Sequence, residues 1–145
     1  MGADVTPARE CIEAAIAAAA GRPMAWGRDD CCLWAAGIVR ALTGSDPAAA
    51  WRGYRTPGGA LRRLSRGGVP AALAEAARAQ GWPEIDCVDA ATGDLGAVVS
   101  PSRRPFQGAA VIRLDGWWVG REDGGVGFLP ANAVTHAWRL PVCRP

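Results

Sequence analysis

The chain has 145 residues, of which 50% are hydrophobic and 21% are charged, and its formal net charge is +2. This length suits one domain with its own core, so residues 1–145 are expected to form a single domain. A charge so close to zero predicts no nucleic-acid partner and places most arginines on the solvated surface. No apolar run approaches the roughly 20 residues of a membrane span, and the N-terminus lacks the pattern of a signal peptide. The sequence thus predicts neither a membrane partner nor secretion.

The first half of the chain is predicted to be helical. One helix begins at Thr6 and Pro7, because threonine caps a helix and proline suits its first position. It ends near Gly21, which precedes a proline by two residues. After the second helix, described next, we expect a short helix within residues 54–68 and a longer one over residues 69–81.

The second helix begins within "DDCC", with Asp30 as its N-cap and Cys31 as its first residue, and it ends at "TGSDP". Projected at about 100° per residue, the angle of an ideal helix, its apolar residues gather on one side. These residues are Cys31, Ala35, Ile38, Val39 and Leu42, whereas Gly37, Arg40 and Thr43 fall on the other side. Cys31 is therefore expected on the buried face and Cys32 at its margin.

The second half changes to short apolar segments separated by Gly, Pro and Asp, a pattern that predicts strands joined by tight turns. The segments are "GDLGAVVS", "AAVIRL", "WWVGR", "VGFLP" and "AVTHAWRL", with a turn around Asp115 and Gly116. Helices followed by such strands predict an α+β fold, with N-terminal helices packed on a C-terminal antiparallel sheet. Strand alternation places Trp117 and Trp118 on opposite faces, one in the core and the other as a candidate lining for a peptide or glycan groove.

The five cysteines are Cys11, Cys31, Cys32, Cys87 and Cys143. Their odd number, in a chain without a secretion signal, argues against a disulfide framework. No Cys-x-x-Cys pair occurs and His136 is the only histidine, so we expect neither a metal site nor a cofactor. Cys31 differs from the other cysteines because the N-terminus of a helix favours a thiolate.

The chain contains an aromatic–glycine turn, an Asp–Cys pair that opens an apolar helix, and a downstream "GDL" strand. The residues concerned are Trp26, Gly27, Asp30, Cys31, Gly93, Asp94 and Leu95. This combination resembles the NlpC superfamily of papain-like cell-wall cysteine peptidases. The closer similarity is to an uncharacterised branch found in phages and prophages, through "WGRDDCCLWAA", "TGSDP", "RGYRT" and "AWR", over roughly residues 20–140.

The resemblance implies a papain-like fold with Cys31 as the nucleophile, supported by Trp26, Asp30 and Asp94. It also implies phage tail proteins or peptidoglycan peptides as partners, and the bacterial cytoplasm or a phage particle as the location. In the active peptidases a histidine begins the strand after "GD[LV]", and the matching residue here is Ala110. Alanine accepts no proton, so the standard cysteine–histidine dyad is missing.

His136 is the only histidine that could replace this base. Alternation along the last predicted strand places Val134, His136 and Trp138 on one face. His136 is then either a hydrogen-bonded, half-buried residue or the base for Cys31.

Three functions stay open at this point. The first is a phage or prophage tail-assembly or tail-tip component with degenerate or weak cysteine hydrolase activity. The second is an active cysteine peptidase or amidase on peptidoglycan stem peptides, with Cys31 as nucleophile and His136 as base. The third is a non-enzymatic module that binds a peptide. A hydrogen bond between Cys31 and His136 would favour the enzyme.

Overall fold

The computed structural model describes residues 7–25, 27–49, 68–99 and 108–142. Within these ranges the helices are α1 (Pro7–Ala19), α2 (Cys31–Thr43) and α4 (Gly68–Gln80). The strands are β1 (Glu84–Ile85), β2 (Leu95–Val98), β3 (Ala109–Leu114), β4 (Trp117–Glu122), β5 (Gly125–Pro130) and β6 (His136–Trp138), and two short 3₁₀ helices are η2 (Cys87–Asp89) and η3 (Ala131–Ala133). The predictions for Thr6, Trp26, "RGYRT", residues 54–67 and Cys143 lie outside the described residues.

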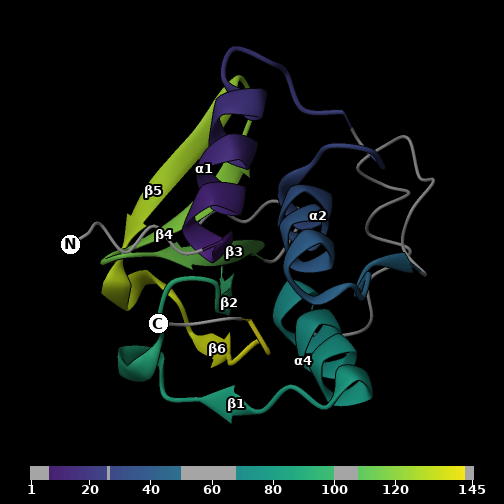
Figure 1. Ribbon diagram of the computed structural model, residues 1–145, viewed down its shortest axis with the longest axis vertical. Coiled ribbons are helices and arrows are strands. Elements are labelled where there is room, and N and C mark those ends of the chain that lie inside the picture. Colours follow the sequence, from purple (N-terminus) through teal and green to yellow (C-terminus); the bar gives the residue numbers. More distant parts are fainter. Residues whose placement is uncertain (1–6, 26, 50–67, 100–107, 143–145) are drawn as a thin grey trace.

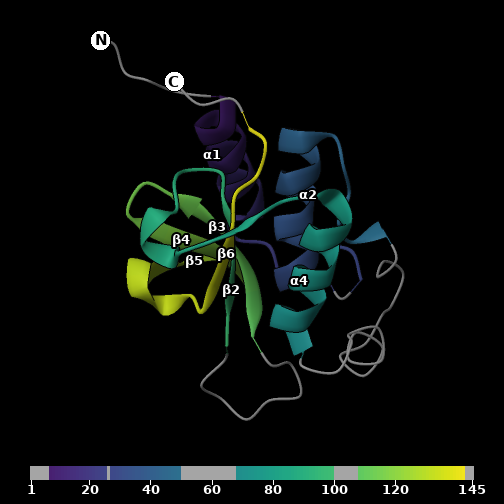
Figure 2. The same ribbon diagram turned by 90° about the horizontal axis from the view of Figure 1, so that it is seen from below.

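The strands form one antiparallel sheet in the order β1-β6-β2-β3-β4-β5. The three helices lie on one face of this sheet, and η2 and η3 lie on the other (Figures 1 and 2). The predicted α+β arrangement, with N-terminal helices on an antiparallel sheet, is therefore confirmed. Strand β1 was not predicted, because two residues are too few to show a period of alternation.

Helix α2 begins and ends where the sequence predicts. The carboxylate of Asp30 accepts hydrogen bonds from backbone N–H groups that have no partner inside the helix. At the other end Gly44 adopts a left-handed conformation, with φ of 82°, and its N–H donates to the carbonyl of Arg40. Both ends are thus fixed by local sequence, so the position of Cys31 at the first turn is also local.

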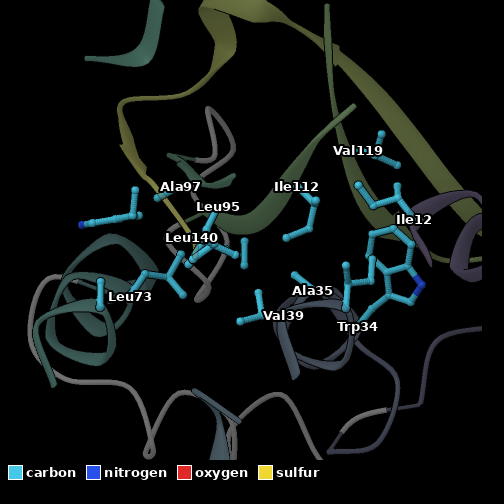
Figure 3. Close-up of a cluster of buried hydrophobic side chains, with 14 of the residues drawn as sticks. Ile12, Trp34, Ala35, Val39, Leu73, Leu95, Ala97, Ile112, Val119 and Leu140 are labelled. Atoms are coloured by element: carbon cyan, nitrogen blue, oxygen red, sulfur yellow. The ribbon is translucent and has the colours of Figure 1, made fainter. Parts of the chain in front are cut away.

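The main core lies between the helices and the sheet (Figure 3). Ile12 from α1, Val39 from α2 and Leu73 from α4 meet Leu95 and Ile112 from the sheet. Burial of this apolar surface from all three helices is the main stabilising contribution to the fold. Among the described residues, no helix combines the length and the apolar character that crossing a bilayer would require.

The helical projection was wrong about which cysteine faces the core. Cys32 packs against the main core, together with Ala35 and Val39, whereas Cys31 is not part of that cluster. These three residues are spaced by three and four positions and so share one side of α2. Helix α2 has a second buried side, where the indole of Trp34 donates to the carbonyl of Ala15 on α1. A helical projection that assumes a single buried side cannot distinguish these two buried sides of α2.

A second, smaller core lies on the other face of the sheet. It contains Val111, Trp118, Val134 and Ala137. The expected grouping of Val134 with His136 and Trp138 is therefore wrong, since Val134 packs on the face opposite Trp138. The physical reason is that β6 begins only at His136, and the η3 turn before it interrupts the alternation.

Candidate functional site

The first turn of α2 holds the candidate site. One carboxylate oxygen of Asp30, Oδ1, accepts from the N–H groups of Cys32 and Leu33 at 3.1 and 2.9 Å. The other, Oδ2, accepts from the N–H of Gly27 at 3.1 Å. Asp30 is 1% exposed, and these bonds hold the loop before the helix against its first turn. As a result, Cys31 is fixed at the N-terminal position that favours a thiolate.

The pKa values of the two neighbouring cysteines shift in opposite directions. The hydrogen bond from the Cys32 side chain lowers the pKa of Cys31, and the N–H groups of Cys32 and Cys31 act in the same direction. Burial and the charge of Asp30 oppose this lowering, but the net shift is downward. The bond to Cys31, and then burial, raise the pKa of Cys32 well above its ordinary value. Of the two thiols, Cys31 therefore forms a thiolate the more readily.

Strand β3 meets this pair at Ala110. The backbone of Ala110 hydrogen-bonds to Cys32 and, by stabilising a thiolate there, opposes part of the rise in its pKa. Ala110 itself is 1% exposed, and its side chain belongs to the main core. The position that the motif resemblance assigns to a base thus lies beside the cysteine pair, and it offers a methyl group and a backbone N–H.

The loop that leads into the site is tied to the sheet by a buried ion pair. The guanidinium of Arg121 on β4 donates from Nε and Nη2 to the two carboxylate oxygens of Asp29, at 3.1 and 2.9 Å. It also donates to the carbonyls of Arg22 and Pro23 at 3.0 and 3.2 Å. Arg121 is only 4% exposed, so it is an exception to the expectation that most arginines lie on the solvated surface. Arg121 alternates with Trp117 and Val119 along one face of the strand, and this pattern would have indicated that Arg121 faces the helices.

The contacts described for Asp94 do not include the cysteine pair, and they link two neighbouring strands, β2 and β6. Its carboxylate accepts from the N–H of Ala91 at 2.9 Å, from Nε of Arg139 at 3.0 Å and from the N–H of Leu140 at 3.3 Å. Asp94 is fully buried, and its bonds join the start of β2 to the segment after β6. The geometry around this residue describes a structural anchor.

The adjacent tryptophans lie on opposite faces, as alternation predicts. Trp118 is fully buried in the second core, where its indole donates to the carbonyl of Ala131 at 3.2 Å. A side chain at Gly96 would overlap its ring, at 2.7 Å from the nearest atom. Trp117 is 51% exposed on the other face, near Phe128 on the neighbouring strand, which is 50% exposed. Neither tryptophan belongs to the cysteine pair's hydrogen-bond network.

His136 lies on the same row of the sheet as Ala110, with Ala97 between them. Because neighbouring strands lie about 4.8 Å apart, the Cα atoms of Ala110 and His136 are separated by about 10 Å. The imidazole Nδ1 is 3.1 Å from a carboxylate oxygen of Glu84, and the ring stacks on Trp138 with a centroid distance of 6.1 Å. In this conformation His136 is engaged by β1 and β6, and its use as a base for Cys31 stays a prediction.

The other described thiols have a different environment. Burial raises the pKa of Cys11 on α1. Burial, then the charges of Glu84 and Asp86, raise the pKa of Cys87. Within the described part of the chain, no three His, Cys, Asp or Glu side chains lie close enough together to hold a metal ion.

A groove of about 420 Å³ runs between α1 and α2. Its lining includes the small residues Ala15, Ala18 and Gly37, and neither Cys31 nor Cys32 is among the lining residues. The groove is lined by Asp29 and Leu33, which flank the two cysteines in sequence, but not by the cysteines themselves.

Fold and site together define an α+β domain with a cysteine pair at the start of a helix, next to an antiparallel sheet. Residues 6–140 match a family model described as Domain of unknown function (DUF6950), and the chain belongs to this family. No curated protein and no solved structure matches the chain.

Proposed function

We propose that this protein is an NlpC-type, papain-like cysteine protein that keeps a reactive Cys31 and has weak or no hydrolase activity. The observation that carries the proposal is the combination of Cys31 at the first turn of α2 with Ala110 beside the pair. The lowered pKa of Cys31 favours the thiolate, which is the nucleophilic form of cysteine. Peptide hydrolysis also needs an acid–base group that protonates the leaving amine. Such a group typically contributes about 10²–10⁴ in rate.

The proposed biological role is that of a phage or prophage tail-assembly or tail-tip component. It is supported by the motif resemblance, through "WGRDDCCLWAA", "TGSDP", "RGYRT" and "AWR". In this role the site would engage peptidoglycan peptides or tail proteins without efficient cleavage.

Hydrolysis of peptidoglycan stem peptides tests the proposal directly. We expect purified wild-type protein to release no fragments above a Cys31→Ala control, measured by mass spectrometry. Release that disappears in both Cys31→Ala and His136→Ala would overturn the proposal and make His136 the base. Loss in Cys31→Ala alone would point to another base.

A restored imidazole gives the converse test. Because Cys32 contacts Ala110, the variant Ala110→His is paired with Cys32→Ala, which provides room for the ring. Gain of Cys31-dependent hydrolysis in the double variant, relative to Cys32→Ala alone, would support a papain-like cleft that lacks only its base. Without such a gain, a peptide-binding function is favoured over a hydrolase origin.

A further inference from the structure

We propose that the groove between α1 and α2 is a binding site for a long-chain carboxylate, a molecule with a thin alkyl chain and one anionic end. The alkyl chain lies between the two helices, and the carboxylate meets Arg22 and Arg28, in the segment that connects α1 to α2. This site goes beyond the proposed function, because neither Cys31 nor Cys32 lines the groove.

The groove is an apolar channel between two neighbouring helices. Helices α1 and α2 lie next to each other on the sheet (Figures 1 and 2), and the space between them has a volume of about 420 Å³. Its lining from α2 includes Leu33, Trp34 and Ile38, and its lining from α1 includes Cys11 and Ala15. Small-molecule sites typically have volumes of about 300–1,000 Å³ and mostly apolar walls with a few polar groups, and this groove fits that description.

One end of the groove carries a net positive charge. Its charged lining residues are Arg22, Arg28 and Asp29. The carboxylate of Asp29 is paired with the buried guanidinium of Arg121, at 3.1 and 2.9 Å.

The two remaining charges are both cationic. The side chain of Arg22 is 63% exposed, and its guanidinium donates to the carbonyl of Ala18 at 3.3 Å and lies 3.8 Å from Asp29. Arg28 is exposed, and its guanidinium makes no hydrogen bond or ion pair within the part of the chain that the structure describes. An anionic group at this end of the groove therefore gains two cationic partners without displacing the Arg121 pair.

Gly37 in the middle of α2 is explained by the groove and by nothing else in its surroundings. A Cβ atom added there would meet no atom within 4 Å, and the residue has no positive φ, so the fold does not require glycine. Glycine inside a helix is less favourable than alanine. Because Gly37 lines the groove, a side chain at this position would enter the space between the helices. The glycine keeps that space open.

The shape of the groove favours a thin chain over a partner helix. The indole of Trp34 donates to the carbonyl of Ala15 at 3.4 Å, so the two helices touch across the groove. Leu33, Trp34 and Ile38 are less than a tenth exposed. A helix, about 10–12 Å wide, would rest on the exposed small residues at the rim, whereas a single alkyl chain can enter.

The length of the groove sets the length of the ligand. The walls from Cys11 to Ala19 and from Leu33 to Ala41 each span about 12 Å, at about 1.5 Å per helical residue. An extended alkyl chain, with C–C bonds of about 1.5 Å, advances about 1.3 Å per bond. A chain of about ten carbons therefore fills the groove.

The experiment titrates the full chain with decanoate below its micelle concentration and measures binding by calorimetry. We expect one decanoate per chain, weaker binding of octanoate by about tenfold, and no binding of acetate, because each buried methylene contributes to affinity. Cys11 reports the location, since its thiol lines the groove. Saturating decanoate should slow alkylation of Cys11 by iodoacetamide and leave alkylation of Cys87, which does not line the groove, unchanged.

A plugged groove provides the first variant. Gly37→Leu is expected to stay folded, because leucine is a better helix former and its Cβ meets nothing, and to abolish decanoate binding. Ala79→Leu, at an exposed position on α4, is the matched control and should bind like the wild type. Circular dichroism verifies folding, and Ala41→Leu is the second plug if Gly37→Leu is not folded.

The cationic end provides the second variant. Arg28→Gln should weaken decanoate binding by about twofold to fivefold, as expected for an exposed ion pair, and leave binding of the neutral 1-decanol unchanged. Arg78→Gln removes an exposed arginine of α4 and should change neither affinity.

Each failure has its own meaning. Equal affinities for decanoate and 1-decanol overturn the anionic end. Undiminished binding to a folded plug variant, several decanoates of equal affinity per chain, or binding without protection of Cys11 overturns the site. An acidic amphipathic helical peptide that protects Cys11 when decanoate does not overturns the ligand class in favour of a partner helix. None of these readouts uses Cys31, so their failure does not affect the proposed function.

Discussion

Two buried aspartates begin two segments of this fold, and they do different work. Asp30 precedes helix α2 and Asp94 precedes strand β2, and they are 1% and 0% exposed. The bonds of Asp30 described above reach Gly27, Cys32 and Leu33, all within three residues in sequence. Asp94 instead bonds to Arg139 and Leu140, more than forty residues away.

The difference teaches how to distinguish an anchor from a site component. The charge of Asp94 is paired with the guanidinium of Arg139, and its bonds join the start of β2 to the segment after β6. The charge of Asp30 lies next to a thiol, where it raises the pKa of Cys31 and partly opposes the helix terminus. Both aspartates belong to the motifs that carry the family resemblance, so motif membership alone does not separate the two roles. The two roles are distinguished by the neighbouring group, which is a guanidinium for Asp94 and a thiol for Asp30.

Removal of the Asp94 carboxylate should have the largest effect. Asp94→Ala leaves the buried N–H of Leu140 and the guanidinium of Arg139 without this acceptor, which is expected to lower the free energy of unfolding by about 3 kcal/mol. Urea denaturation measures the change. Asp123→Ala is the matched control, since within the described residues Asp123 accepts a single, exposed bond, from the N–H of Met24 at 3.0 Å. Equal losses in the two variants would contradict the assignment of Asp94 as an anchor.

Removal of the Asp30 carboxylate should have a smaller effect on stability. Asp30→Ala abolishes the N-cap of α2, a loss that typically lowers the free energy of unfolding by about 1–2 kcal/mol. The same urea titration measures it. A loss larger than that of Asp94→Ala would reverse the comparison and show that the local cap also carries long-range structure.

The thiols provide a third test, through the pH dependence of alkylation. The pKa of Cys31 is lowered, whereas those of Cys11 and Cys87 are raised. As pH rises, the thiolate of Cys31 should form first, so competitive iodoacetamide labelling should reach Cys31 at a lower pH than Cys11 or Cys87. Peptide mapping by mass spectrometry measures the order.

The variant Asp30→Asn sharpens this test. It keeps an oxygen that accepts from Cys32 and Leu33, but it removes the charge that raises the pKa of Cys31. Labelling of Cys31 should therefore begin at a still lower pH than in the wild type. A shift in the opposite direction would mean that the carboxylate contributes to the site mainly through the geometry of its cap.

The smallest effect is expected at Trp117, which lies outside both aspartate regions. Its side chain is 51% exposed, so Trp117→Ser should change the free energy of unfolding by no more than about 0.5 kcal/mol. Trp118→Phe is the buried counterpart, because it loses both ring volume and the bond to the carbonyl of Ala131. A large loss at Trp117 with none at Trp118 would contradict the assignment of the two faces.

The sequence by itself determined the elements whose causes are local. Asp30 before an apolar run and Gly44 after it define both ends of α2, because caps act within three or four residues. Alternation separated Trp117 from Trp118. The Asp115–Gly116 dipeptide predicted the turn before them, and Asp115 has the left-handed φ of 52° that such a turn requires. The position of Cys31 at a helix start was predictable for the same reason.

Only the tertiary structure decided the contacts between distant segments. That Cys32 rather than Cys31 packs on the core depends on α2 being covered by both the sheet and α1, which no single-helix projection contains. The pairing of Asp29 with Arg121 joins residues 92 positions apart, and composition alone suggested a solvated arginine. The engagement of His136 by Glu84 depends on β1, a strand too short to be recognised. Long-range contacts are set by how several elements pack at once, and a local pattern carries no record of that packing.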